Sequence, residues 1–137
     1  MNNQQIGIAG ELRVMSELIL KGYNPAKSYI DDGIDIILQD GIKIQVKTSI
    51  RKAKENSKTL GYRFQVRKGN LKKVVDPSTY VDFLICWGVA DNIFWIIPAK
   101  NIGKRSCIHI TYPKIYKKTI WEKYQDRWNF LSGRGGE

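Results

Sequence analysis

The stretch that decides the fold reads Gly33-Ile-Asp-Ile-Ile-Leu-Gln-Asp-Gly-Ile-Lys-Ile-Gln-Val-Lys47. Its first half is rich in β-branched residues, and its second half alternates apolar with polar side chains. Asp40-Gly41, between the halves, is a strong turn signal. The stretch therefore predicts a β-hairpin. Gln45 and Lys47 share one face of its second strand, because they lie two residues apart.

The length of the turn decides whether Asp35 shares a face with Gln45. A two-residue Asp40-Gly41 turn puts Asp35 opposite Val46, on the other face. A three-residue loop that also includes Gln39 puts Asp35 opposite Gln45, and it places the glycine at the left-handed position that such loops need. We favour the longer loop, or a bulge near Asp35, because it gathers polar side chains that would otherwise be buried singly.

Upstream of the hairpin, residues from about Gln5 to Gly22 are predicted to form a helix. Apolar side chains recur there at spacings of three and four, namely at Ile8, Leu12, Met15 and Ile19. Glu11 lies within about 40° of Met15 and Leu18 around this helix, so it belongs to the apolar side. An acid is rarely placed there without a partner, although a carboxylate near a helix start can also reach solvent.

The rest of the chain predicts further strands and a closing helix. The expected strands are residues 62–66, 80–88, 93–97 and 107–111, the second of them buried on both faces. Residues 51–60 are expected to form an exposed basic loop, and residues 70–75 a short helical turn ended by Asp76-Pro77. Ile120, Trp121, Tyr124, Trp128 and Leu131 fit one face of a terminal amphipathic helix. We therefore expect one α/β domain over residues 1–137, with a mixed β-sheet flanked by helices.

The positive charge of the chain is concentrated in one stretch. The formal net charge is +10. Residues 43–73 hold eleven lysines and arginines against one acid, and the remaining residues hold twelve of each sign. Such a field attracts a polyanion, although a basic loop can also serve solubility alone. We expect nucleic acid as the partner, with phosphate contacts from Lys43, Arg51, Lys52, Lys54, Lys58, Arg63, Arg67 and Lys68.

Composition excludes some classes of protein. No run of about 18 apolar residues exists, which excludes a membrane-spanning helix. The first residues lack the basic and apolar regions of a signal peptide. Cys86 and Cys107 each lie within an apolar stretch and are expected to be buried thiols in the reducing cytoplasm.

The polar residues of the hairpin and the helix limit the chemistry that they could support. Carboxylates from Glu11 and Asp35, with the side-chain oxygen of Gln45 between them, would form a hard oxygen site of the kind that Mg²⁺ prefers. The ammonium of Lys47 could stabilise developing charge or help to orient and deprotonate an attacking water. Hydrolysis of phosphodiester bonds needs these parts, and the adjacent basic stretch could hold the nucleic-acid backbone. Each of the four residues taken alone could equally be structural.

Three motifs in this order resemble the PD-(D/E)XK nuclease superfamily. They are Gly7-Ile-Ala-Gly-Glu11, Gly33-Ile-Asp-Ile-Ile37 and Gln45-Val-Lys47. Within the superfamily, the chain is similar to archaeal Holliday-junction resolvases and to group I intron-encoded homing endonucleases. The resemblance is clearest over residues 7–48.

The resemblance implies a restriction-endonuclease-like α-β-β-β-α-β core, metal-dependent cleavage of double-stranded DNA, and a homodimer or homotetramer. By position it implies that Glu11 and Asp35 are metal ligands and that Lys47 is the catalytic lysine. Ser28 matches a serine found near the site in the resolvases. Gln45 stands where most members carry an acid, although some members, including intron-encoded ones, are similar in having glutamine there.

Two classes of function therefore compete. The first is a site-specific endonuclease of the homing or restriction-like kind, with a junction resolvase as a variant of it. The second is a DNA-binding module that kept the fold and lost catalysis, for which the neutral side chain of Gln45 is the reason. A magnesium-dependent nicking assay on plasmid DNA separates the two classes.

The basic stretch generates a testable prediction. Replacing Arg51, Lys52 and Lys54 with alanine is expected to weaken DNA binding and to flatten its salt dependence, by roughly 0.9 log–log units for each phosphate that the variant no longer neutralises. Fluorescence anisotropy of a labelled duplex over a salt series measures both effects. An unchanged slope in the triple variant would place the DNA-binding surface elsewhere.

Overall fold

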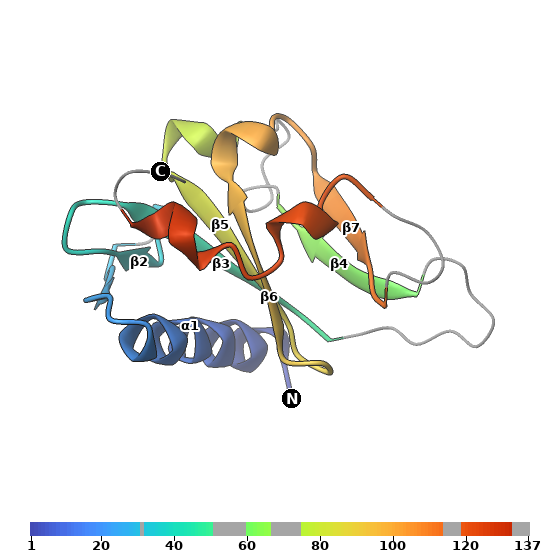
Figure 1. The fold of residues 1–137 in the computed structure, drawn as a ribbon, viewed down its shortest axis with the longest axis horizontal. Helices are drawn as coiled ribbons and strands as arrows, with labels where there is room; N and C mark the ends of the chain where they lie inside the picture. Colours follow the sequence, from blue (N-terminus) through green and yellow to red (C-terminus); the bar gives the residue numbers. More distant parts are fainter. Residues whose placement is uncertain (31, 51–59, 67–74, 114–118, 133–137) are drawn as a thin grey trace.

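The fold was analysed in a computed structural model (Figure 1), which describes the chain except for residues 31, 51–59, 67–74, 114–118 and 133–137. Its main sheet has five strands in the order β1-β2-β3-β5-β6. These are β1 (Ala26–Lys27), β2 (Ile36–Ile37), β3 (Lys43–Ser49), β5 (Phe83–Gly88) and β6 (Ile93–Pro98). The pair β3 and β5 is parallel and the other three pairs are antiparallel, so the expected mixed sheet of an α/β fold is confirmed.

One strand of a second, two-stranded sheet lies in the connection that parallel pairing requires. The chain must leave the main sheet after β3 in order to re-enter it in the same direction at β5. On this path it forms β4 (Gly61–Gln65), which pairs antiparallel with β7 (Cys107–Thr111). The predictions of strands near residues 62–66 and at 107–111 are thus confirmed.

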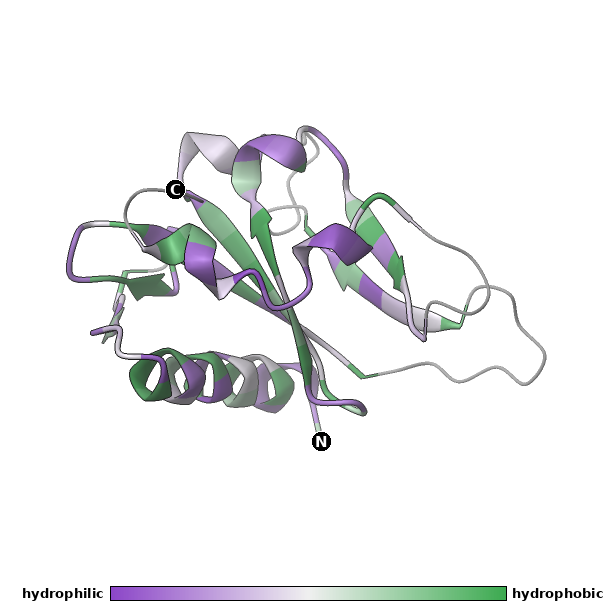
Figure 2. Ribbon diagram, viewed as in Figure 1, coloured by the Kyte–Doolittle hydropathy of each residue, from purple (hydrophilic) through white to green (hydrophobic). Residues whose placement is uncertain are grey.

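The main sheet is covered on both faces. Alternate residues of β5 point to opposite sides, with Ile85 in one apolar cluster and Leu84 and Cys86 in the other. The first cluster lies against helix α1 (Asn3–Leu20), and the second against the β4–β7 pair (Figure 1). Figure 2 shows β5 and β6 as hydrophobic along most of their length. The predicted burial of this central strand is confirmed, although the strand begins at Phe83 and not at Tyr80.

Aromatic rings join the second sheet to the first. Trp95 of β6 is fully buried, and its ring lies 5.7 Å from that of Tyr62 and 6.0 Å from that of Phe64, both on β4. Tilted and edge-on contacts at this spacing add to the free energy gained from burial alone. Trp95, Trp121 and Trp128 are buried, and Trp87 is half-buried. Cys86 is a buried thiol, as expected, whereas Cys107 is only half-buried.

Helix α1 begins with a capping box, in which the side chains of Asn2 and Gln5 each accept the other's backbone N–H. The helix ends before Gly22, whose φ of +91° is a conformation that glycine adopts without strain. Its predicted extent is confirmed. No helix in the described part of the chain is long and apolar enough to cross a membrane.

The predicted core face of α1 was wrong. The helix is buried through Gly10, Val14 and Leu18. Of the four residues predicted to form the core face, Met15 is only half-buried and the other three are exposed, with exposed fractions of 44% for Ile8, 59% for Leu12 and 59% for Ile19. The reason is the closeness of helix and sheet: a methyl group at Gly10 would overlap the hydroxyl of Thr48 on β3. The side with the smallest residue therefore faces the sheet, and a larger side chain there would hold the helix away.

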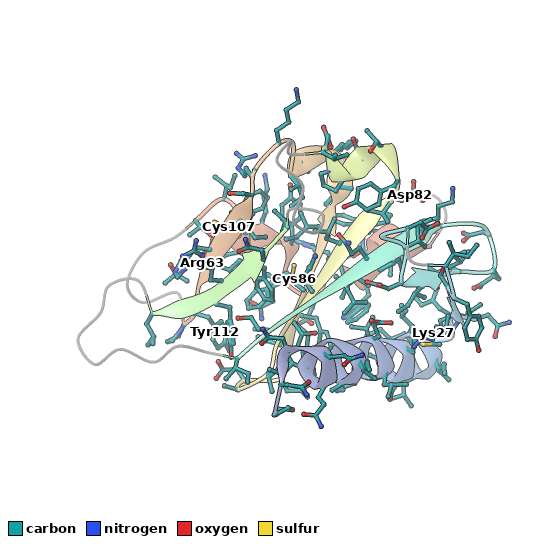
Figure 3. All side chains as sticks on the ribbon, turned by 180° about the vertical axis from the view of Figure 1, so that it is seen from behind. Lys27, Arg63, Asp82, Cys86, Cys107 and Tyr112 are labelled. Atoms are coloured by element: carbon teal, nitrogen blue, oxygen red, sulfur yellow. The ribbon has the colours of Figure 1, made fainter. Side chains whose placement is uncertain are left out.

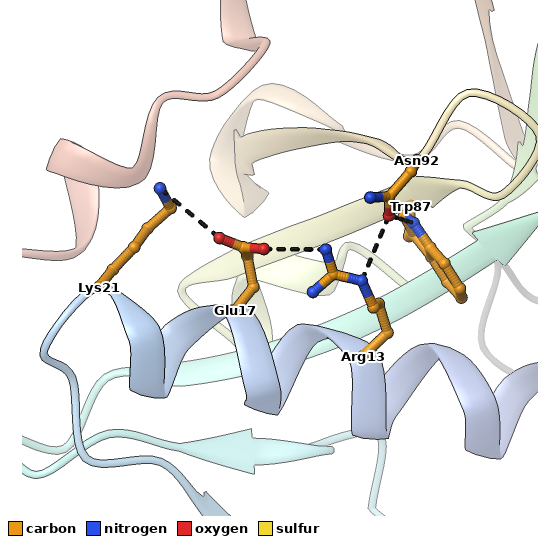
Figure 4. Close-up of polar contacts among 5 residues, drawn as sticks. All are labelled: Arg13, Glu17, Lys21, Trp87 and Asn92. Carbon is orange, nitrogen blue, oxygen red and sulfur yellow. Dashed lines mark hydrogen bonds and ion pairs between the residues drawn. The ribbon is translucent and has the colours of Figure 1, made fainter.

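Polar contacts fix the same helix to the turn between β5 and β6. Arg13 donates from Nε to Asn92 Oδ1 at 3.3 Å, and Trp87 Nε1 donates to the same oxygen at 2.9 Å (Figure 4). Glu17 accepts from Arg13 at 2.9 Å and pairs with Lys21 at 3.7 Å. Charge pairs at this spacing on an exposed helix contribute only a few tenths of a kcal/mol each. We infer that they set the helix's rotation more than its stability.

The predicted terminal helix was wrong as well. Residues 119–132 form two short 3₁₀ helices, η3 (Glu122–Tyr124) and η4 (Trp128–Leu131). Between them Gln125 forms a β-bridge with Trp95, and Asp126 N–H donates to the carbonyl of Phe94 at 3.0 Å. Strand β6 is an edge of the main sheet, so its unpaired backbone groups bind this segment and interrupt the helix. In the described residues, α1 is the only α-helix.

Two further short 3₁₀ helices flank β5 and β6. The Asp76 side chain accepts from Ser78 N–H at 2.9 Å and caps η1 (Pro77–Thr79). The other, η2 (Ala99–Asn101), follows β6. Residues 51–59 of the expected basic loop and residues 70–74 of the expected turn lie outside the described residues.

The close approach of α1 to β3 predicts that replacing Gly10 with alanine destabilises the protein, the reverse of the usual effect of this change in a helix. In an exposed helix interior Gly→Ala gains up to about 1 kcal/mol. Gly10→Ala is expected instead to lower the free energy of unfolding by about 1–3 kcal/mol, because Thr48 must move. Denaturant unfolding measures the change.

Gly7→Ala is the matched control, because a methyl group there would have nothing within 4 Å. It is expected to leave stability unchanged or raised. Equal stability of the two variants would show that helix and strand are not in close contact at Gly10.

Candidate functional site

The hairpin adopts the three-residue loop. Leu38 N–H donates to the carbonyl of Ile42 at 2.9 Å, and Ile36 is the partner of Ile44. Gly41 has a φ of +89°, the left-handed conformation that this loop requires. Continued by one residue, the register sets Asp35 opposite Gln45, as we favoured from the sequence.

At Asp35 the ladder of backbone hydrogen bonds between β2 and β3 ends, and the side chain of Asp35 accepts the next hydrogen bond. A continued ladder would offer a backbone carbonyl to the N–H of Val46. Instead Asp35 Oδ2 accepts that N–H at 2.7 Å, while the N–H of Asp35 donates to the carbonyl of Ile44 at 2.9 Å. The carboxylate is therefore held at the point where the two strands part. Ser28 adjoins it, since its N–H donates to the carbonyl of Asp35 at 3.0 Å.

The environment of Asp35 favours its protonated form. Burial raises the pKa of this carboxyl to about 6, and the negative charge of Glu11 adds to the rise. The hydrogen bond from Val46 and the positive charges of Lys47 and Lys27 act in the opposite direction. Burial wins, so at neutral pH the protein holds a carboxylate at a free-energy cost that a bound cation would relieve.

Gln45, which the continued register sets opposite Asp35, is buried, with an exposed fraction of 7%. Its carbonyl oxygen, Oε1, is shielded from solvent and has no hydrogen-bond partner within the described residues. An acceptor left in this way costs about 1–3 kcal/mol, which is why such atoms are rare. An amide oxygen beside a carboxylate is a ligand pair that Mg²⁺ accepts, so these residues fit the metal that the sequence implies.

Lys47 is close to the same carboxylate. Burial lowers the pKa of its ammonium, and the charges of Asp35 and Cys86 oppose the shift. No ion pair of Lys47 within 4 Å is found in the described part of the chain. A half-buried ammonium of this kind keeps its donors available for a substrate oxygen.

Glu11 approaches from the helix. It is half-buried, lies 3.8 Å from Lys27 Nζ of β1, and is close enough to raise the pKa of Asp35. Asp35, Gln45 and Lys47 thus lie together, with Glu11 at their edge. Across the described residues, no three acidic, histidine or cysteine side chains form a cluster able to hold an ion. A metal here would therefore depend on the amide of Gln45 as well as on the two carboxylates.

Two of the basic residues expected to contact DNA lie within the described part of the chain. Lys43 is exposed at the start of β3, where its backbone N–H donates to Asp82 at 2.9 Å. Arg63 is exposed on β4, and its guanidinium lies 3.5 Å from Cys107 Sγ of β7 (Figure 3). The other candidates lie outside the described residues: Arg51, Lys52, Lys54, Lys58, Arg67 and Lys68.

Sequence reasoning did not single out Tyr80, which lies beside these residues. A methyl group at Gly33, whose φ is +90°, would come within 2.6 Å of the Tyr80 ring. Burial raises the pKa of its phenol, the nearby side chain of Gln45 opposes this rise, and the charge of Asp35 adds to it. Tyr80 is distant in sequence from both partners, so no local pattern could have revealed the contact.

A surface hollow of about 530 Å³ lies elsewhere, between the start of β5 and the end of β6. Its lining includes Asp82, Lys100 and Tyr124. Since none of Glu11, Asp35, Gln45 and Lys47 lines it, we place the candidate site at the hairpin, where the perturbed groups are.

Comparison with known proteins gives one kind of likeness. Neither a family model nor a curated protein sequence matches this chain. Among solved structures, the chain is similar to one described as the structure of a bacterial homing endonuclease, I-Ssp6803I, with a TM-score of 0.75 and 18% sequence identity. The match covers 98% of this chain and 94% of that one. At this level of identity the likeness shows a shared fold.

The raised pKa of Asp35 predicts how stability depends on pH. Between about pH 4 and pH 6 the folded protein keeps a proton that the unfolded chain releases, so stability falls as pH rises and the cost is complete above about pH 6. Asp35→Asn keeps an acceptor for Val46 but cannot ionise. Without metal it is expected to gain about 2 kcal/mol over wild type at about pH 8 and little at about pH 4.

Urea unfolding in the presence of a chelator measures both differences. Asp40→Asn is the control, because Asp40 is exposed and asparagine suits the same turn. A gain from Asp35→Asn that is equal at the two pH values would mean that the charge of Asp35 carries no cost in the fold.

Proposed function

We propose that this chain is a single-domain, magnesium-dependent endonuclease that hydrolyses phosphodiester bonds of double-stranded DNA at specific sites. The observation that carries the proposal is the buried, unpartnered carbonyl oxygen of Gln45, at the strand position opposite the buried carboxylate of Asp35. Burying both groups destabilises the metal-free protein, and a divalent cation stabilises both at once. The arrangement therefore makes sense as part of a metal site.

In this proposal Asp35, Gln45 and Glu11 hold the ion. When bound there, Mg²⁺ supplies positive charge to a phosphate oxygen and acidifies a coordinated water. The two carboxylates offset the charge of the ion, and the Gln45 oxygen adds a neutral ligand. Because a neutral ligand leaves the ion less well compensated than a third acid would, we expect weak metal binding until the DNA phosphate joins the ligands.

Lys47 acts on the substrate in this scheme. It is on the face of β3 that Gln45 occupies, and its ammonium is close enough to Asp35 for their charges to interact. An ammonium at this position stabilises negative charge that develops on the phosphate and orients the attacking water. Its energetic effect then falls on the transition state more than on metal binding.

Specific recognition of DNA is the part of the proposal that depends most on the fold and the charge. The similar solved structure is described as a homing endonuclease. The net charge of +10 lies within residues 43–73, the segment that begins inside the site. We therefore favour a homing enzyme, of the intron-encoded kind, or a restriction-like enzyme. A resolvase acting on four-way junctions is the alternative within the same chemistry.

We further propose that the enzyme is a homodimer or homotetramer. Each chain offers one site, so a cut in both strands of a duplex requires at least two copies. The stripe formed by Ile8, Leu12 and Ile19 on α1 is apolar and exposed, as surfaces that meet another subunit often are. A monomeric mass in solution, both with and without DNA, would contradict this part of the proposal.

A non-catalytic DNA-binding module is the competing function, and the neutral Gln45 is the observation that favours it. Single-turnover cleavage over a magnesium titration decides between the two. Lys47→Ala is expected to lower the cleavage rate by about 10²–10⁴-fold with little change in metal affinity. Asp35→Ala is expected to remove both. Gln45→Glu is expected to tighten metal binding and keep some cleavage, since a third charge joins the ligands.

Supercoiled plasmid, a linear duplex library and a four-way junction are the substrates, and they separate the homing or restriction-like enzyme from the resolvase. Lys104→Ala, which removes an exposed lysine outside the site, controls for loss of charge alone. If Asp35→Ala and Lys47→Ala cleave as wild type does, these residues are structural. DNA binding without magnesium-dependent cleavage by wild type would favour the binding module.

A further inference from the structure

The pair of strands β4 and β7 forms a ribbon with one apolar face and one polar face. Its buried side chains belong to the apolar cluster that covers one side of the main sheet. The alternate side chains point the other way, and they are Arg63 and Gln65 on β4 and Cys107 and His109 on β7. Arg63 and Gln65 are exposed, and the two of β7 are half-buried. The outer face of the ribbon is therefore polar and open to solvent.

This outer face carries positive charge without acids. Arg63 is paired with His109, and its guanidinium donates to Cys107 Sγ, a weak acceptor, at 3.5 Å (Figure 3). No ion pair of Arg63 is found among the residues that the structure describes. Residues 60–66 and 103–113, which contain the ribbon, hold three lysines and arginines and no acid. The donors of Arg63 are thus available, and the surroundings attract a polyanion.

The ribbon lies on the side of the main sheet to which Gln45 and Lys47 point. Both residues pair in register with residues of β5 that belong to the cluster against β4 and β7, namely Leu84 and Cys86. Tyr62 of the ribbon lies over Gly88, where a methyl group would come within 2.7 Å of its ring. Gly88 is the partner of Ser49, two residues beyond Lys47. A duplex bound at Lys47 therefore lies beside the ribbon.

The dimensions of the ribbon fit the major groove of B-DNA, which is about 12 Å wide and admits a two-stranded β-ribbon. Outward side chains that follow each other along one strand are about 6.8 Å apart. Two base-pair steps span about the same length. Arg63 and Gln65 therefore match base pairs two steps apart. An arginine forms two hydrogen bonds with the major-groove edge of guanine, and a glutamine forms two with that of adenine.

We propose that the β4–β7 ribbon enters the major groove and that Arg63 and Gln65 determine sequence specificity, Arg63 by reading a guanine and Gln65 by reading an adenine two base pairs away. This inference rests on the proposed function, because it assigns residues to the specific recognition of double-stranded DNA. It gives Arg63 a base contact in place of the phosphate contact expected from the sequence. Lys43 keeps its expected phosphate contact, which carries no sequence information.

The experiment compares the sequence preferences of wild type and variants of the full chain. Each protein is incubated with a randomised duplex library and Ca²⁺ in place of Mg²⁺, an ion of the same charge that also prefers oxygen ligands, and the bound duplexes are sequenced. Arg63→Ala is expected to lose a preference for guanine at one position of the recognition sequence, by about tenfold to a hundredfold. Gln65→Ala is expected to lose a preference for adenine two base pairs away by a similar factor.

Gln65→Glu is the variant that changes specificity instead of removing it. It is expected to exchange the preferred adenine for cytosine, because a carboxylate accepts from the amino group of cytosine. Lys43→Ala is the matched control. It is expected to weaken binding about equally for all sequences and to leave both base preferences in place.

Modified DNA tests the groove directly. Replacing the preferred guanine with 7-deazaguanine removes only the N7 acceptor of the major groove. This change is expected to weaken binding by wild type about tenfold and binding by Arg63→Ala by less than about twofold, because the variant no longer makes the contact. Thermal unfolding of each variant reports on the fold and is expected to be unchanged, since both side chains are exposed.

Magnesium-dependent cleavage of the same library by wild type tests the proposed function separately. Two results would overturn the inference while wild type remains a specific endonuclease. An equal loss of affinity for all sequences in Arg63→Ala would reduce its role to a phosphate contact, and unchanged preferences in Arg63→Ala and Gln65→Ala would place the readout on another surface. If wild type binds and cleaves all sequences alike, the site-specific function fails and this inference fails with it.

Discussion

The carboxylate of Asp35 accepts the N–H of Val46, and the arrangement of the site depends on this hydrogen bond. It forms where β2 and β3 part, so one side chain both completes the backbone ladder and stands at the opening between the strands. The bond lowers the pKa of Asp35, but burial and the charge of Glu11 act in the opposite direction. Their effect is the larger one, and the pKa is raised to about 6. The fold thus holds an anion where anions are disfavoured. Proteins commonly accept such a cost at sites that bind a cation.

The neighbours of Asp35 share this conflict. Gln45 buries a carbonyl oxygen without a partner, and Lys47 buries part of an ammonium whose pKa is thereby lowered. In a purely structural core, these positions would be better filled by apolar side chains. The adjacent strand β5 is filled in that way, with Leu84 and Ile85 fully buried. The polar cluster is therefore a local exception in an otherwise apolar sheet, which is the usual pattern of a functional site.

Two backbone contacts with the sheet decide how the rest of the chain packs. Gly10 lets α1 approach β3 closely, and this fixes which side of the helix is buried and brings Glu11 to the edge of the site. At the other edge of the sheet, Gln125 and Asp126 bind the backbone of β6 and divide the last segment into two short helices. The first contact buries a face of α1 other than its apolar stripe. The second replaces the terminal helix that the sequence predicts with two short ones.

The sequence by itself determined the extent of α1 and every described strand except β1, and it favoured the turn that sets Asp35 across from Gln45. These features depend on neighbours in the chain: alternation in residues 42–47, a capping box at Asn2, and a glycine where the loop turns left-handed. Only the tertiary structure decided which face of α1 is buried and whether residues 120–131 form one helix. Periodicity in the sequence reveals an apolar stripe but not the surface against which the helix packs. The stripe of Ile8, Leu12 and Ile19 is exposed because α1 packs on the sheet through Gly10, which is small enough for close contact with Thr48. The position of Tyr80 beside the site was also decided by the tertiary structure, because Tyr80 meets Gly33 and Gln45 only after β5 pairs with β3.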